Sequence, residues 1–309
     1  MKRFIIITIT ILVLVSLGVA SYMTKRFNTS SALFRSSDET ISVVATFYPL
    51  GHFAEQVGGD AVTVTVITPS GVEPHDYAAT PHDIATILQA DLFLRNGQGL
   101  DPWADQITST EFINQSAISI TMTDQVQLRK DVDAALDPHI WLDPVLAQDQ
   151  IALIRDALIQ LDPNKAASYQ AKADSYINSL AELDRQFSIG LTNCRVRTIV
   201  TAHDAFGYLG ERYTIGLLPV AGLSPEATPS AKTLADISSQ IQAHRINYIF
   251  AEPLVQTQFA DVIAEQTNAT VLVLNPLEGL TAEEVTAGKN YLTVMTENLN
   301  NLRLAMDCQ

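Results

Sequence analysis

Hydrophobic and polar positions alternate with two different periods in the first half of the chain. Short apolar runs rich in β-branched residues predict buried strands, and the amphipathic runs between them predict helices. Strands are predicted at 41–47, 61–67 and 92–94, and helices at 48–58 and 80–89. Strands that alternate with helices are typical of a parallel sheet with helical crossover connections. The first half is therefore predicted to be an α/β lobe.

The middle of the chain has a different pattern. Two amphipathic runs, 145–161 and 165–189, follow one another with only a short break. The second run is rich in Ala and other good helix formers and contains neither Gly nor Pro. We expect it to form one long rigid helix that connects two halves.

The strand–helix alternation returns after this connector. Strands are predicted at 198–201, 215–220, 248–251 and 270–274, and a last helix at 291–306. The sequence thus predicts an α/β protein with two lobes built on parallel sheets. The predicted organisation is an N-terminal lobe at 41–144, connecting helices at 145–190 and a C-terminal lobe at 191–309.

The N-terminus carries an export signal. Segment 1–23 begins with a short basic stretch and then continues without a charge, and Gly18 and Ala20 fit a small-residue cleavage site. If the segment stays uncut, its apolar run is long enough to span a bilayer as an anchor. Residues 24–40 are rich in Ser and Thr and predict a flexible stalk. Either alternative places residues 41–309 in the periplasm or at the cell surface.

The charge balance narrows the classes of partner. The chain has 19 Lys and Arg against 34 Asp and Glu, a formal net charge of −15. Such a surface argues against nucleic-acid binding and against a polybasic membrane patch on the folded part. It is compatible with a cationic ligand, although many soluble proteins are acidic for solubility alone. A hydrophobic content of 47% excludes a disordered chain.

The chain contains two cysteines, Cys194 and Cys308. An even count in an exported protein predicts a disulfide, which would tie the end of the chain to the start of the second half. Two free thiols are the alternative. A cysteine metal site is disfavoured because no further Cys or nearby His completes one.

Candidate ligand residues lie in four loops, each of which follows a predicted strand or a buried apolar run. The loops read GVEPHDY at 71–77, DPHIWLDP at 137–144, TAHDAFG at 201–207 and NPLEGL at 275–280. Loops at the carboxyl ends of parallel strands are where open α/β sheets bind ligands. Each loop contributes one candidate ligand, and together these are His75, His139, His203 and Glu278.

Three imidazoles and one carboxylate would make a tetrahedral set of three nitrogens and one oxygen. Such a set suits a borderline divalent cation, zinc first. Manganese is a weaker candidate, because its sites carry more oxygen ligands. The long spacing between the four residues follows no local rule, so spacing alone is weak evidence.

The other polar candidates are interpreted as structural. His52 and His82 lie in predicted helices as surface or core residues, and His244 is predicted to be solvated. Glu252 follows a strand, and two alternatives stay open for it: a group that supports a metal ligand from behind, or the start of a helix. Asp131, Asp133 and Asp137 form an acidic loop, which is interpreted as a solvated turn; electrostatic attraction of cations toward the cleft is the alternative.

Taken in order, the segments EPHDY, DPHIWLDP, TAHDAFGY and NPLEGL resemble the metal-binding solute-binding proteins of ABC transporters, the ZnuA/TroA-like family. The resemblance extends from about residue 41 to the C-terminus. It implies two (β/α) lobes joined by a single long rigid helix, with one metal ion in the cleft between the lobes. That architecture agrees with the connector predicted from the helical run.

The resemblance also implies a ligand set. The family's histidine ligands map onto His75, His139 and His203. Many members use an Asp in an Asp-Pro turn as the fourth ligand, but Asn275 stands in that place here. The zinc-binding members with an NPLEG motif use its Glu, which maps onto Glu278. The His-rich loop of many zinc-binding members is absent from residues 76–138, which contain a single His.

The function implied is capture of zinc outside the cytoplasm and its delivery to an ABC-type membrane permease, without enzymatic activity. The expected partners are a divalent metal ion and the permease, and we expect a monomer. One alternative is a zinc-dependent hydrolase or lyase with Glu278 as general base. No HExxH, P-loop or nucleophile-elbow motif occurs, however, and a carboxylate in fourth place closes the open position that an enzyme needs. The other alternative is a surface adhesin that retains the fold.

Overall fold

The structure is a computed structural model. It describes residues 39–108, 117–131, 134–226, 228–256 and 258–309. Residues 40–309 form one compact unit. The predicted signal or anchor at 1–23 lies outside the described residues, as does nearly all of the predicted stalk at 24–40. Among the described helices, none is long and apolar enough to cross a membrane.

The first lobe is built on a four-stranded parallel sheet with the order β2-β1-β3-β4. Its strands are β1 (Ile41–Ala45), β2 (Val62–Val66), β3 (Leu92–Arg95) and β4 (Ile118–Thr121). The central strand β1 is buried almost throughout, whereas β2 at the edge alternates exposed Thr with half-buried Val. This difference is why β1 reads as a continuous apolar run and β2 as an alternation.

Three helices accompany this sheet, namely α2 (Tyr48–Gly58), α3 (Pro81–Ile87) and α4 (Pro102–Thr108). Helix α2 ends at a Gly pair, and Gly59 turns the chain toward β2 at a φ of 53°, which a residue with a side chain rarely adopts. Helix α3 begins with a capping box formed by Thr80 and Asp83.

The second lobe repeats the topology, with a parallel sheet in the order β6-β5-β7-β8. Its strands are β5 (Thr198–Thr201), β6 (Gly216–Pro219), β7 (Tyr248–Ala251) and β8 (Thr270–Val273). Its helices are α7 (Gly207–Tyr213), α8 (Ala231–His244), α9 (Gln258–Thr267) and α10 (Ala282–Thr286). Apolar residues of α8, α9 and the sheet form a core of their own.

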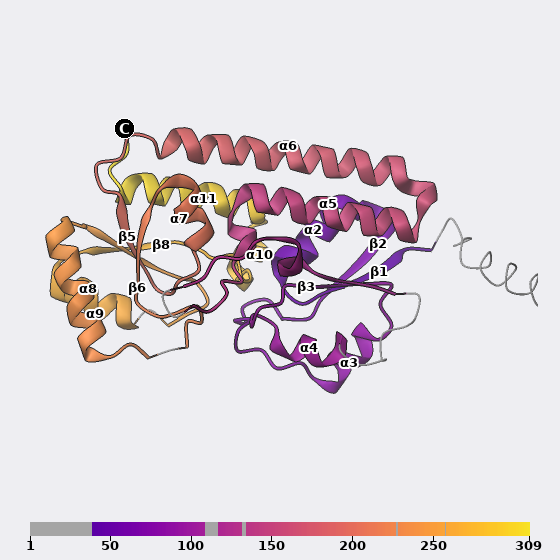
Figure 1. Ribbon diagram of the computed structural model, residues 1–309, viewed down its shortest axis with the longest axis horizontal. Coiled ribbons are helices and arrows are strands. Elements are labelled where there is room, and N and C mark those ends of the chain that lie inside the picture. The colour runs from indigo at the N-terminus through magenta and orange to yellow at the C-terminus, as the bar shows by residue number, and fades with distance from the viewer. Residues whose placement is uncertain (1–38, 109–116, 132–133, 227, 257) are drawn as a thin grey trace, which may run out of the picture. The chain divides into compact units, whose positions relative to one another are not determined.

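The two lobes are spanned by a layer of long helices (Figure 1). These are α5 (Pro144–Leu161), α6 (Ala166–Gly190) and the last helix α11 (Tyr291–Ala305). The 25-residue α6 packs against α5, α2 and α11. Its buried residues recur every three or four positions, which places one face of the helix on the core. The predicted fold of two parallel α/β lobes joined by a long helix is confirmed.

Short 3-10 helices complete the described elements, at Gly59–Ala61 (η1), Met122–Gln125 (η2), Ile140–Leu142 (η3) and Pro163–Lys165 (η4). Cys194 and Cys308 form the predicted disulfide, which joins the segment after α6 to the segment after α11. Backbone hydrogen bonds from Arg195 and Val196 to the last residues of the chain accompany it. The C-terminus is therefore fixed to the second lobe.

Candidate metal centre

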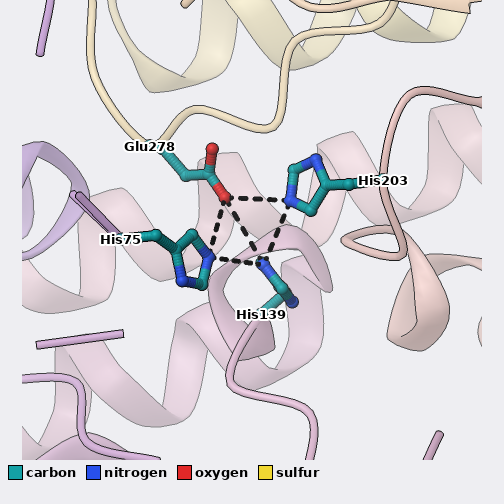
Figure 2. Close-up of side chains that lie close together, drawn as sticks. All are labelled: His75, His139, His203 and Glu278. Carbon is teal, nitrogen blue, oxygen red and sulfur yellow. Dashed lines mark hydrogen bonds and ion pairs between the residues drawn. The ribbon is translucent and has the colours of Figure 1, made fainter. Parts of the chain in front are cut away.

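The four residues singled out in the sequence come together at one point (Figure 2). His75 lies between β2 and α3, and His139 directly precedes η3. His203 lies between β5 and α7, and Glu278 between β8 and α10. Each sheet thus contributes to the centre with loops that follow its strands, as expected for ligand sites of parallel sheets.

The Nε2 atoms of the three histidines and Oε1 of Glu278 form a compact cluster, in which all four atoms lie within 4.8 Å of one another. Nε2 of His139 lies 3.4 Å from Nε2 of His75 and 3.4 Å from Nε2 of His203. Oε1 of Glu278 lies 3.6, 3.4 and 3.2 Å from Nε2 of His75, His139 and His203. A tetrahedral zinc ion with ligand bonds of about 2.0–2.1 Å separates its ligand atoms by about 3.3–3.4 Å. The donor set therefore has the size that one zinc ion requires.

The carboxylate of Glu278 is buried in surroundings that favour its negatively charged form. Its side chain is buried, and neither oxygen has a hydrogen-bond partner among the described residues. Burial raises the pKa of Glu278, but the surrounding imidazoles of His203, His139 and His75 outweigh it and hold the pKa well below its usual value. A buried carboxylate is costly unless positive charge meets it, which the imidazoles provide in the metal-free protein and a bound cation would provide in their place. The centre is thus prepared for a cation.

His139 is supported from behind by a carboxylate. Its Nδ1 lies 2.8 Å from Oδ1 of Asp137, and its backbone N–H donates to the same oxygen. Burial lowers the pKa of His139, but Asp137 and Glu278 together raise it. Asp137 is completely buried, so its prediction as part of a solvated turn is wrong. The signal in the sequence was an Asp two residues before a candidate ligand, within DPH.

His203 has an equivalent partner from another strand. Its Nδ1 lies 2.6 Å from Oε2 of Glu252, which follows β7 and is buried. Burial lowers the pKa of His203, but Glu252 and Glu278 raise it well above its usual value. Of the two alternatives left open for Glu252, the structure shows the supporting role.

His75 lacks such a partner. Its Nδ1 has no hydrogen-bond partner in the described part of the chain, and burial is the main reason why its pKa is lowered. Its backbone N–H donates to Glu73, a buried carboxyl that the sequence reasoning missed. Burial and the neighbouring Glu278 raise the pKa of Glu73 to about 9.

Asn275 belongs to the loop of Glu278 but not to the cluster. Its Oδ1 accepts a hydrogen bond from the backbone N–H of Leu277, and its Nδ2 donates to Glu284. Leu277 has a φ of 58°, so the loop turns sharply just before Glu278. Asn275 therefore shapes the turn that presents Glu278.

The remaining histidines lie elsewhere. His52 of α2 is buried beside Tyr176, with its Nε2 2.9 Å from the hydroxyl oxygen, and burial lowers its pKa to about 4. His82 is exposed in α3, and His244 is exposed at the end of α8 beside Gln240. These three are structural or solvated, as the sequence predicted.

Comparisons with known proteins agree with this fold. Residues 43–305 match the family model for zinc-uptake complex component A, periplasmic (ZnuA). The chain is 34% identical over 281 residues to the high-affinity zinc uptake system protein ZnuA of Bacillus subtilis, covering 87% of this chain and 88% of that protein. It is 32% identical to the zinc-binding lipoprotein AdcA of Streptococcus pneumoniae, of which it spans only 57%.

Solved structures show the same similarity. The Zn(II)-bound ZnuA-like domain of Streptococcus pneumoniae AdcA is 33% identical and superposes with a TM-score of 0.78, covering 87% of this chain and all of that one. The laminin-binding protein Lmb of Streptococcus agalactiae, described as bifunctional with adhesin and metal transporting activity, is 30% identical with a TM-score of 0.78, over 87% of this chain and all of that one. With a family match over most of its length, this chain belongs to the family of periplasmic zinc-uptake component A proteins.

Proposed function

We propose that the protein captures one zinc ion outside the cytoplasm, between His75, His139, His203 and Glu278, and delivers it to the membrane permease of an ABC transporter. The observation that carries this proposal is the cluster of three Nε2 atoms and one carboxylate oxygen, with five of its six distances between 3.2 and 3.6 Å and all within 4.8 Å. The family membership and the zinc uptake named for its relatives support it.

Zinc is favoured over manganese by the chemistry of the ligands. Neutral imidazole nitrogens suit zinc, whereas manganese prefers carboxylate, carbonyl and water oxygens. The set offers three nitrogens and one carboxylate oxygen in one compact cluster. A second carboxyl, Glu73, is close, and in the metal-free protein burial and Glu278 raise its pKa, which disfavours a second negative charge beside Glu278.

Transport is favoured over catalysis because the protein offers four zinc ligands, which leaves no coordination position open for water or substrate. Catalytic zinc sites hold the ion with three protein ligands and leave the fourth position to water or substrate. Here Glu278 occupies the fourth position, and its Oε1 lies close to all three imidazoles. A carboxylate that binds the ion is also not free to act as a general base.

Metal binding is tested by competition calorimetry on the purified protein. One zinc per chain and a much weaker binding of manganese are expected. Glu278→Ala should weaken zinc binding by about tenfold or more, which is about 1.4 kcal/mol or more. Asn275→Ala on the same loop is the matched control and should lose less, because Asn275 acts on the turn. Parent-like affinity of Glu278→Ala with weak binding of Asn275→Ala would refute the ligand assignment.

Delivery is tested in cells that lack the gene for this chain. The parent gene should restore growth in zinc-limited medium, and Glu278→Ala should not, while both proteins are exported in equal amounts. Equal growth with the two genes would show that uptake does not depend on this metal centre. In that case the adhesin alternative would gain support.

A further inference from the structure

Arg129 connects the metal centre to a helix of the second lobe. It lies in the segment between η2 and His139, and its guanidinium contacts two carboxylates. Nη1 donates to Oδ2 of Asp137 at 2.5 Å, and Nε donates to Oε1 of Glu211 on α7 at 2.7 Å. The Asp137 side chain is fully buried, whereas that of Glu211 is 66% exposed. The inner pair is therefore the one protected from solvent screening.

Asp137 is shared between Arg129 and His139. Its Oδ2 accepts from Arg129, and its Oδ1 accepts from the backbone N–H of His139 and lies 2.8 Å from Nδ1. Outer partners of this kind fix the tautomer and the orientation of a metal-binding imidazole. The guanidinium in turn neutralises and orients Asp137, so the contacts run from His139 through Asp137 to Arg129 and on to Glu211.

Tyr208 of α7 reinforces the same connection. Its hydroxyl donates to the backbone O of Asp137 at 2.8 Å and accepts from the backbone N–H of Arg129 at 3.1 Å. The guanidinium also lies over its ring, 5.5 Å from the centroid. Both ends of the loop that precedes His139 are thus fastened to α7, the helix that follows the loop of His203.

The close approach of Arg129 to α7 requires a glycine. A Cβ atom added at Gly207 would lie 1.5 Å from Nη1 of Arg129 and 2.6 Å from Oδ2 of Asp137. The backbone of Gly207 is not in the left-handed region, so an alanine could adopt it. Both the flexible end of Arg129 and the carboxylate of Asp137 must move away from this atom. Gly207→Ala therefore disrupts the contact between Arg129 and Asp137 without changing a candidate ligand itself.

We propose that Arg129 is a positioning residue for the zinc site. It holds Asp137, and through it His139, in a clamp on α7 that consists of Arg129, Asp137, Tyr208 and Glu211. Through the clamp, the second lobe orients His139, although His139 precedes the long connecting helices in the sequence. This inference rests on the proposed zinc function, because positioning is measured here through zinc affinity.

The test compares Arg129→Gln, Gly207→Ala and the double variant. The control is Arg155→Gln, because Arg155 pairs with Asp156 on α5 and its side chain has the same exposure of 19% as that of Arg129. Zinc affinity is measured by competition with a chelator. In the metal-free protein, the nitrogen-15 NMR signal of His139 Nδ1 reports its tautomer and its hydrogen bond to Asp137. Circular dichroism and thermal unfolding confirm that each variant is folded.

Arg129→Gln and Gly207→Ala are each expected to weaken zinc binding about tenfold, at the lower end for outer partners of metal ligands. Both should shift the His139 signal, and the double variant should be no weaker than Arg129→Gln, because both changes break the same contact. Arg155→Gln should stay within twofold of the parent. If Arg129→Gln does not fold, Gly207→Ala and Arg129→Lys decide the question, since Lys keeps the charge but cannot bridge two carboxylates as a fork.

The inference would be overturned by either Gly207→Ala or the folded Arg129 variant if its zinc affinity stays within twofold of the parent and its His139 signal is unchanged. A parent protein that binds no zinc would instead overturn the proposed function. The His139 signal of the metal-free variants would still decide whether Arg129 positions that imidazole.

Discussion

The three histidines of the candidate metal centre are oriented in different ways. The loop of His75 differs in this respect from the loops of His139 and His203. Asp137 and Glu252 hold the Nδ1 atoms of His139 and His203, at 2.8 and 2.6 Å. The Nδ1 of His75 has no such partner among the described residues. Two candidate ligands are therefore oriented by buried carboxylates in the metal-free protein, and the third is oriented mainly by its own loop.

The three histidines also differ in how deeply they are buried. His139 and His203 are completely buried. His75 borders a cavity of about 300 Å³ that is also lined by Gln98, Gly99, Pro138, Leu223 and Ser224. His75 therefore lies on the more accessible side of the centre, with a side chain that is 6% exposed, while the side chains of His139 and His203 are fully enclosed. A preoriented ligand loses less freedom on binding, so its removal should cost more.

The largest effect is expected from the ligands themselves. His203→Ala should weaken zinc binding more than about 100-fold, beyond the 10–100-fold typical of outer partners. It also leaves Glu252 buried without its partner. His75→Ala should lose less, because water can take its place beside the cavity. Competition titrations with a zinc chelator measure both, and a larger loss for His75→Ala would reverse the comparison.

The supporting carboxylates should come next. Glu252→Gln and Asp137→Asn keep the size of the side chain but remove the negative charge behind His203 and His139. Each should weaken zinc binding about 10–100-fold. Asp156→Asn on the exposed face of α5 is the control and should have no effect. Parent-like affinity of both variants would show that the hydrogen bonds at Nδ1 do not prepare the ligands.

Proton release should differ between the two kinds of histidine. The pKa of His203 is raised well above 6.5, so at pH 7 the metal-free protein holds a proton there that zinc must displace. The lowered pKa of His75 means that it is already neutral. Zinc binding at pH 7 should therefore release about one proton or more per ion, and affinity should fall as pH is lowered.

Calorimetry in buffers with different ionisation enthalpies counts these protons. Glu252→Gln should release fewer, because Glu252 is the main group that raises the pKa of His203. His75→Ala should release as many as the parent. An equal decrease in both variants would contradict the assignment of the proton to His203.

The smallest effect on zinc is expected at His52, a buried histidine without a carboxylate. Its pKa of about 4 lies below the unfolded value, so between pH 4 and 6.5 only the unfolded chain is protonated there. The free energy of unfolding should therefore fall as pH falls through this range, by up to about 3 kcal/mol from this residue. Denaturant unfolding of metal-free His52→Gln should show a weaker dependence on pH, and its zinc affinity should stay within twofold of the parent.

The sequence was sufficient for the candidate ligands because each lies in a short motif at the end of an element. His139 and His203 occur within DPHIWLDP and TAHDAFGY, and Glu278 occurs within NPLEGL. Strand β4 and the helices α4, α7, α8, α9 and α10 were not predicted individually. Strand β4 has four residues, and its burial pattern shows no clear alternation, so local propensity does not distinguish it.

The groups behind the ligands were harder to predict. Glu252 lies 49 residues from His203, and Glu211 lies 82 residues from Arg129, so no local pattern connects the members of either pair. Asp137 is only two residues from His139, but an acidic loop is usually solvated, and only packing against α7 shows that it is buried. Burial, not residue type, decides whether such a carboxylate supports a ligand or faces water.

Periodicity and short motifs are local properties of the chain, so the alternation of strands and helices, the long connector and the four residues that offer ligand atoms could be predicted from them. How these residues meet, and how their surroundings differ, became visible in the folded protein. Folding brought Glu252 behind His203 and fastened the loop of His139 to α7 through Arg129. It also left His75 beside a cavity. The physical reason is that hydrogen bonds, burial and the resulting pKa shifts depend on distances between segments far apart in the chain, and these distances exist only after folding.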